Sequence, residues 1–155
     1  MEIEEIVKVL IYIIIGVGLI ISTITDIKSK RIHVGIVGMV SAVCFVLNII
    51  IGSMNIHEII GIFIIGILFL SIVLISGGQL GTGDVCIFLM TGVGIGIAGN
   101  IYLIFISFII AAFAASYLII FKKKARIYKM PFVPYVMAGY VIYLIDKAGG
   151  ISGVL

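Results

Sequence analysis

The sequence predicts an all-α membrane protein with about six transmembrane helices. Of its 155 residues, 63% are hydrophobic and only 11% are charged. Soluble domains carry about 25% charged residues, so this composition excludes an ordinary soluble protein. Apolar residues also run in stretches that approach the roughly 20 residues a helix needs to cross a bilayer core. No polar segment is long enough to build another domain, and we therefore expect residues 1–155 to form a single integral-membrane domain.

The apolar stretches predict the individual helices in chain order. They cover about residues 6–25, 34–52, 58–76, 84–99, 100–121 and 132–148. The first follows an acidic start and lacks the basic n-region and cleavage site of a signal peptide, so we expect it to be retained. The fourth is short and rich in glycine, a residue that allows close helix packing in membranes. The sixth begins at a proline-containing segment, which is typical of a helix start.

Basic residues predict which side of the membrane each loop occupies. With six spans, the connections after the first, third and fifth share one side. They hold eight of the ten basic residues: Lys28, Lys30, Arg31, Lys122, Lys123, Lys124, Arg126 and Lys129. Lysine and arginine are enriched in cytoplasmic loops, so this side is expected to face the cytoplasm. Both termini are then expected to lie outside.

Two acids, Asp26 and Asp84, stand on this basic side. Asp26 ends the first predicted helix and Asp84 begins the fourth, so both lie at the same membrane depth. Carboxylates near the bilayer are costly and usually face a bundle interior or a wet cavity, where they mark functional sites. A purely structural interpretation is also open, in which Asp26 pairs with Lys28 or Lys30 and Asp84 caps a helix.

If the helices bring Asp26 and Asp84 together, the pair has the chemistry of peptide hydrolysis. Two adjacent carboxyl groups do not both ionise easily, so they share one proton. The ionised partner can accept a proton from water while the protonated partner polarises a peptide carbonyl. Asp84 lies at a helix N-terminus, whose dipole favours negative charge, and Asp26 at a C-terminus. This asymmetry predicts that Asp26 more often holds the shared proton.

Several neighbouring features can be explained by structure alone as well as by function. Gly81 and Gly83 in "LGTGD" permit a sharp turn with positive φ and leave room for a substrate backbone, although a flexible turn needs glycine equally. The "GIGIAG" segment at 94–99 matches G-x-G-x-x-G inside an apolar stretch, which favours helix packing over nucleotide binding.

The competing function is a small proton- or ion-coupled transporter that uses Asp26 and Asp84 as a relay. Transporters more commonly place such acids at the membrane midplane.

Three segments together resemble the type IV prepilin peptidases, membrane aspartyl proteases with a G-x-G-D motif that are related to archaeal preflagellin peptidases. They are "TDIKSKRI" after the first stretch, "GTGDV" at the fourth and "MPFVPYVMAGY" at the sixth. The resemblance implies that Asp26 and Asp84 are the catalytic pair, with Asp84 ending the motif. It also implies an active site on the cytoplasmic side. Pro131, Phe132 and Pro134 are expected to shape its rim.

The resemblance implies an aspartic endopeptidase that removes the short leader from type IV prepilin-like membrane precursors. Val133 stands where the family has glycine in P-F-G-P, and Cys86 stands where the family commonly has lysine. The chain has no room for the methyltransferase region of many bacterial members, so a minimal form is expected. No metal or other cofactor is expected. The expected partners are the precursors and anionic lipids, without nucleic acid, and no oligomeric state is indicated.

Overall fold

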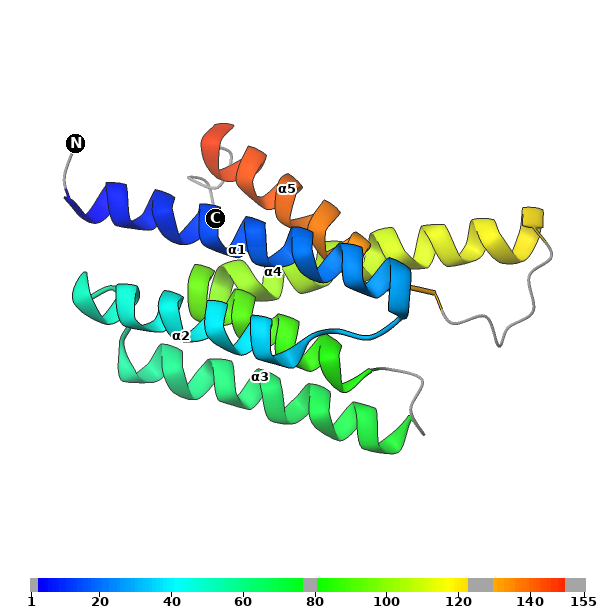
Figure 1. The fold of residues 1–155 in the computed structure, drawn as a ribbon, viewed down its shortest axis with the longest axis horizontal. Coiled ribbons are helices and arrows are strands. Elements are labelled where there is room, and N and C mark those ends of the chain that lie inside the picture. The colour runs from blue at the N-terminus through cyan, green and yellow to red at the C-terminus, as the bar shows by residue number, and fades with distance from the viewer. Residues whose placement is uncertain (1–2, 77–80, 123–129, 150–155) are drawn as a thin grey trace.

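The regular structure of the chain is helical. The computed structural model describes residues 3–76, 81–122 and 130–149, and all regular elements within them are helices. In chain order they are α1 (Ile3–Ser29), α2 (Val34–Ile50), α3 (Ile56–Ile75), α4 (Thr82–Lys122) and α5 (Val133–Gly149). The helices lie side by side in an elongated bundle (Figure 1). The predicted all-α class is confirmed for the described residues.

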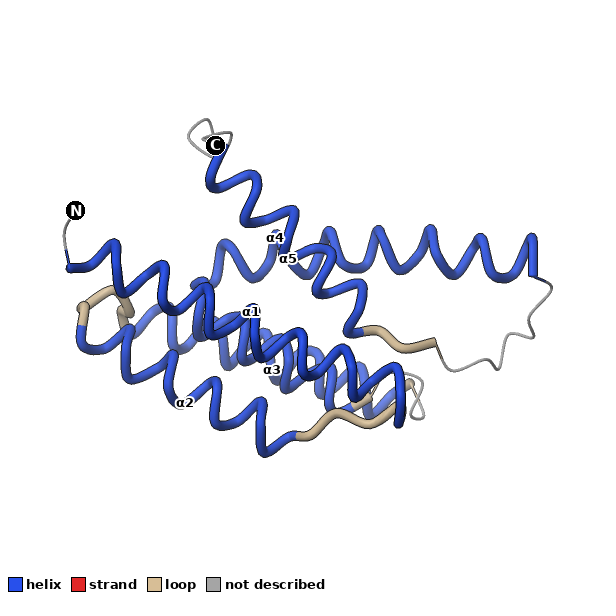
Figure 2. The backbone as a smooth tube through the Cα atoms, turned by 45° about the horizontal axis from the view of Figure 1, so that its top comes forward, coloured by secondary structure: helices blue, strands red, loops and turns tan. Residues whose placement is uncertain are grey.

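Helix α4 contains a reversal of the chain at Gly96. The backbone there has φ 78° and ψ 172°, which is not helical, and its positive φ favours glycine. Nδ2 of Asn100 donates a hydrogen bond of 3.0 Å to the carbonyl oxygen of Phe88. In a straight helix these two residues would stand about 18 Å apart along the axis. Helix α4 therefore consists of a first stretch (82–95) and a second stretch (97–122) that fold back on each other (Figure 2).

The predicted helix boundary at 99–100 is wrong, because the turn falls at Gly96. Among the described helices, three are long and apolar enough to cross a membrane: Ile3–Ser29, Ile56–Ile75 and Thr82–Ile120, the last of which includes the reversal at Gly96. Val34–Ile50 is a shorter apolar helix. The predicted count of six spans is not confirmed. The orientation of the termini likewise stays a prediction, although α1 begins and α5 ends toward the same end of the bundle (Figure 1).

Helix α4 is the centre of the packing. It contacts each of the other four described helices, whereas α3 packs against α4 alone. Close approach depends on glycines: a Cβ at Gly66 would meet Leu89 at 2.7 Å, and one at Gly94 would overlap Ile15. Gly94 belongs to the "GIGIAG" segment, whose helix-packing interpretation this contact supports. Small residues at such contacts are the usual means of association between apolar helices.

The outer surface of the bundle is apolar. Large hydrophobic side chains with more than half of their surface exposed occur on α1, α3 and α4, including Ile13, Phe63, Leu74, Phe105 and Phe113. A surface of this kind is unfavourable in water and marks a face that meets lipid or another apolar partner. Together with the long apolar helices, it indicates a membrane protein.

Substituting Asn100 tests the reversal in α4. The Asn100 side chain is fully buried, and its Oδ1 accepts a 2.8 Å hydrogen bond from the Thr91 hydroxyl, in addition to the bond to Phe88. We expect Asn100→Leu to lower the free energy of unfolding in detergent by about 1–2 kcal/mol, the upper range for polar bonds between membrane helices. Ser116→Ala is the control, because Ser116 is exposed and bonds only the Ala112 carbonyl of its own helix. Equal stability of both variants would contradict the assigned role of Asn100.

Candidate active site

Asp26 lies in the last turn of α1 and reaches the start of α5. Its side chain is only 7% exposed, and Oδ2 accepts a 3.1 Å hydrogen bond from the backbone N–H of Val133. Val133 is the first residue of α5, so this N–H has no acceptor within the helix. The next residue, Pro134, carries no N–H and needs none. Asp26 therefore caps α5 from a distant part of the chain.

Asp84 lies in the first turn of α4 and caps that helix. Its side chain is 9% exposed, and Oδ2 accepts a 3.1 Å hydrogen bond from the backbone N–H of Gly81. The backbone N–H of Asp84 donates in return to the Gly81 carbonyl, also over 3.1 Å. An acidic side chain that reaches back over three residues forms one half of a capping box. The capping role considered for Asp84 on sequence grounds is thus present.

The fold brings these two carboxyl groups into the same environment. They are close enough for the charge of Asp26 to act on Asp84. Each uses Oδ2 to accept a hydrogen bond from a backbone N–H at a helix N-terminus. The sequence predicted that Asp26 more often holds the shared proton, because only Asp84 was expected at a helix N-terminus. That reason no longer applies, because the N-terminus of α5 lies at Asp26 as well. Which aspartate holds a shared proton is therefore not decided by the helix dipoles.

Gly81 and Gly83 both stand in close contact with neighbouring atoms, and their expected role of leaving room for a substrate stays a prediction. Among the described glycines only Gly52 and Gly96 have positive φ, so Gly81 and Gly83 do not use the left-handed conformation that glycine permits. Gly83 is required by close approach instead: an added Cβ would lie 2.8 Å from both Cβ and Cδ1 of Ile32. A Cβ at Gly81 would lie 3.2 Å from Oδ2 of Asp84. Gly83 thus lets the α1–α2 connection pass directly over the start of α4.

The segment before α5 packs into the same end of the bundle. Phe132 meets the ring of Phe88 edge to face, with centroids 5.9 Å apart, and the ring of Phe108 at 5.3 Å. Phe88 follows Asp84 by one helical turn, and Phe132 directly precedes Val133. Pro131 and Pro134, on either side, are half-buried. The predicted rim residues are therefore adjacent to Asp26 through Val133.

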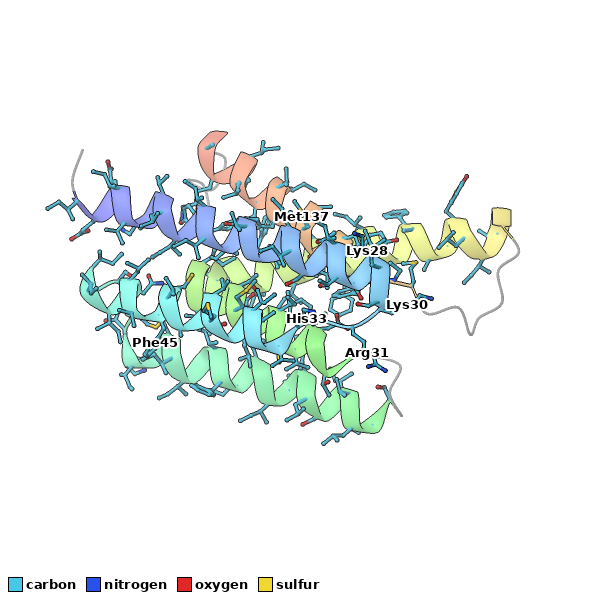
Figure 3. All side chains as sticks on the ribbon, in the orientation of Figure 1. Lys28, Lys30, Arg31, His33, Phe45 and Met137 are labelled. Atoms are coloured by element: carbon cyan, nitrogen blue, oxygen red, sulfur yellow. The ribbon has the colours of Figure 1, made fainter. Side chains whose placement is uncertain are left out.

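Exposed basic side chains lie at this end of the bundle. Lys28, Lys30 and Arg31 are exposed around the end of α1 and its connection to α2, as Figure 3 shows. The other predicted basic positions, Lys123, Lys124, Arg126 and Lys129, and residues 77–80 of the glycine-rich loop lie outside the described residues, as does the Lys122 side chain. Within the described ranges, no group of three or more His, Cys, Asp or Glu side chains is placed to hold a metal ion.

Sequence reasoning missed two contributors to the site. The backbone N–H of Val133 holds Asp26, and the side chain of Ile32 covers Gly83. A backbone donor leaves no signature in residue identity, although the prolines around Val133 do mark a helix start. Ile32 is an ordinary apolar residue at the end of a basic segment. Its contact with Gly83 depends on a packing distance that the sequence does not specify.

We expect Gly83→Ala to reduce strongly the catalytic activity that depends on Asp26 and Asp84. The added methyl group collides with Cβ of Ile32, which is fixed to the backbone, so the start of α4 must shift and carry Asp84 with it. A displacement of about 1 Å can cost roughly 100-fold in rate. Gly35→Ala is the matched control, since its Cβ would meet nothing within 4 Å. Turnover measured at equal protein amounts checks this, and wild-type activity of Gly83→Ala would contradict the close-approach argument.

An α-helical bundle with an apolar exterior and two buried acids at one end defines a membrane protein with a candidate site at its carboxyl groups. Residues 13–116 match the type IV leader peptidase family, over a span that contains both Asp26 and Asp84. The chain belongs to this family, which makes it a membrane protease of the leader peptidase kind. Neither the curated proteins nor the solved structures contain a match to it.

Proposed function

We propose that the protein is an intramembrane aspartyl endopeptidase that removes the leader peptide from type IV prepilin-like precursors at the cytoplasmic membrane face. The observation that carries this proposal is the burial of both Asp26 and Asp84 at the same end of the bundle, where Ile32 of the connection after α1 lies against Gly83, in a member of a leader peptidase family. Burial of two interacting acids is otherwise unfavourable, and it is a common feature of sites that perform acid–base chemistry.

The pair supplies both proton transfers of peptide hydrolysis. One ionised carboxylate removes a proton from water, and the oxygen of that water attacks the scissile carbonyl carbon. The protonated carboxyl group donates a hydrogen bond to the carbonyl oxygen and stabilises the tetrahedral intermediate. When the C–N bond breaks, the carboxyl group that took the proton from water returns it to the leaving amine, and the new carboxylic acid loses its proton to solvent to give a carboxylate and a free amine. The backbone N–H groups of Val133 and Gly81 hold the Oδ2 atoms and so fix the positions of the two carboxyl groups.

The position of the acids suits a precursor with a leader ahead of an apolar helix. The apolar helix remains within the bilayer while the leader junction reaches the end of the bundle where Asp26 and Asp84 lie. Lys28 and Arg31 are exposed near that end, where they can contact anionic lipid headgroups. Each such cation contributes about 1 kcal/mol at a membrane surface. We therefore include anionic lipids among the proposed partners.

Cleavage in liposomes tests the proposed function. Purified protein is reconstituted with a tagged prepilin-like precursor, and products are identified by mass spectrometry. The wild type is expected to release a single leader, and the double variant Asp26→Asn/Asp84→Asn none. A pH-sensitive dye inside the same liposomes reports proton flux. Flux that depends on both acids without leader release would contradict the peptidase proposal and favour the transporter hypothesis.

A further inference from the structure

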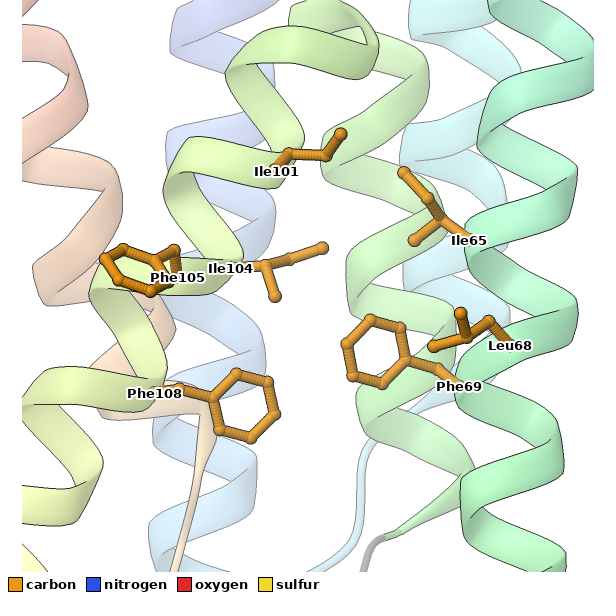
Figure 4. A pocket seen from close by; sticks show the side chains of 7 residues that line it. All are labelled: Ile65, Leu68, Phe69, Ile101, Ile104, Phe105 and Phe108. Atoms are coloured by element: carbon orange, nitrogen blue, oxygen red, sulfur yellow. The ribbon is translucent and has the colours of Figure 1, made fainter.

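An apolar groove lies between α3 and the second stretch of α4. Its volume is about 290 Å³. Figure 4 shows the side chains of the two helices on its opposite sides. All lining residues are hydrocarbon or phenyl: Ile65, Leu68, Phe69, Ile101, Ile104, Phe105 and Phe108. The lining residues all come from α3 and α4, so no other described helix contributes to the wall of the groove.

Four phenylalanines connect this groove to the two acids. We call Phe69, Phe88, Phe108 and Phe132 the phenylalanine cluster. Phe69 and Phe108 line the groove and stack with centroids 6.0 Å apart. The ring centroid of Phe88 lies 4.8 Å from that of Phe69, and Phe88 follows Asp84 by one helical turn. Phe132 directly precedes Val133, whose N–H binds Asp26. The groove wall is thus packed against the immediate neighbours of both aspartates.

A second groove of similar size provides a contrast. Its volume is about 300 Å³, and its lining includes Ala42, Phe45, Met54 and Phe63 from α2, α3 and their connection. Phe45 lies well away from Lys28, Lys30 and Arg31 in Figure 3. None of the phenylalanine cluster lines this groove. The two grooves are therefore alike in size and apolar character. They differ because only the first is connected to Asp26 and Asp84 through the phenylalanine cluster.

We propose that the groove between α3 and the second stretch of α4 receives the apolar helix of the precursor. This inference rests on the proposed function, because it concerns the part of the substrate that follows the cleaved bond. A cavity of about 150 Å³ holds one benzene, so the groove accommodates roughly two large side chains of a helix laid along it. Such helix-in-groove binding uses side chains spaced three or four residues apart. The phenylalanine cluster then aligns the bound helix with Asp26 and Asp84.

Photo-crosslinking tests where the precursor helix binds. A photoreactive amino acid is placed at Leu68 or Ile101 in the Asp84→Asn variant, in membranes that contain a precursor tagged at its C-terminus. We expect crosslinks from both positions to the apolar helix of the precursor. The same probe at Ala42, in the second groove, is the control and should give at least fivefold less product. Crosslinks to lipid alone, to a second copy of the chain, or equally from Ala42 would overturn the proposal.

Filling the groove tests whether it contributes to substrate binding. We expect Ile101→Trp and Leu68→Trp to raise KM for the full precursor at least 10-fold more than KM for a short peptide that spans only the leader junction. Ala42→Trp should leave both values at the wild-type level. Equal changes for the two substrates would overturn the proposed site. Failure of the proposed function is separate: the wild type would then cleave neither substrate, while the crosslinking result would still report binding.

Discussion

Replacing Asp84 by asparagine is expected to reduce leader cleavage by at least about 100-fold, the lower range for loss of a general acid or base. The side-chain oxygen of asparagine can still accept the N–H of Gly81, so the start of α4 should keep its cap. Asparagine can neither accept a proton from water nor donate an acidic one. The substitution should therefore lower kcat without lowering the amount of folded protein. Turnover of a tagged precursor measures kcat, and the yield of monodisperse protein in detergent measures the amount of folded protein.

The control for Asp84→Asn is Asp146→Asn. Asp146 is a half-buried acid in the last turns of α5, toward the end of the helix remote from Val133. The same change of charge and shape there should leave turnover within about twofold of the wild type, as expected for a site away from the chemistry. Substantial cleavage by well-folded Asp84→Asn would remove Asp84 from the mechanism. Equal loss in Asp146→Asn would show that net charge, rather than the pair, is responsible.

Replacing Asp26 is expected to separate catalysis from capping. Asp26→Asn and Asp26→Ala should both lose at least about 100-fold in cleavage, because neither side chain transfers protons. Only alanine also removes the acceptor for the Val133 N–H, which then lies buried without a partner. An unsatisfied buried group costs about 1–3 kcal/mol. Asp26→Ala should therefore lower the free energy of unfolding by this amount, whereas Asp26→Asn should remain close to the wild type.

The two readouts for Asp26 distinguish its roles. Turnover reports the chemistry, and the free energy of unfolding in detergent, or proteolysis near the start of α5, reports the cap. If Asp26→Asn retained full cleavage and Asp26→Ala lost both activity and stability, Asp26 would be a structural cap and not a catalytic acid. If both variants were inactive and equally stable, the hydrogen bond to Val133 would contribute nothing measurable to the fold.

Much of the fold could be predicted because long apolar stretches in a sequence identify membrane helices. A long apolar stretch must satisfy its backbone hydrogen bonds internally, so it forms a helix whatever surrounds it. The starts of α2 at Val34 and of α5 at Val133 fall at or next to the predicted positions. The division of α4 was misplaced, because the apolar pattern continues through Gly96 without change. The turn position depends on the bonds of Asn100 to Thr91 and Phe88, which form only once the two stretches pack.

The sequence by itself determined the helical class, the apolar exterior and the two acids at helix ends. These follow from residue type and local spacing, since the cost of a carboxylate near lipid and the length of a membrane helix do not depend on the fold. Only the tertiary structure decided that Asp26 binds the start of α5 and that Gly83 lies under Ile32. It also decided that four phenylalanines join a groove to the acids. These contacts link segments far apart in the chain, and apolar helices carry little local information about which partner they meet.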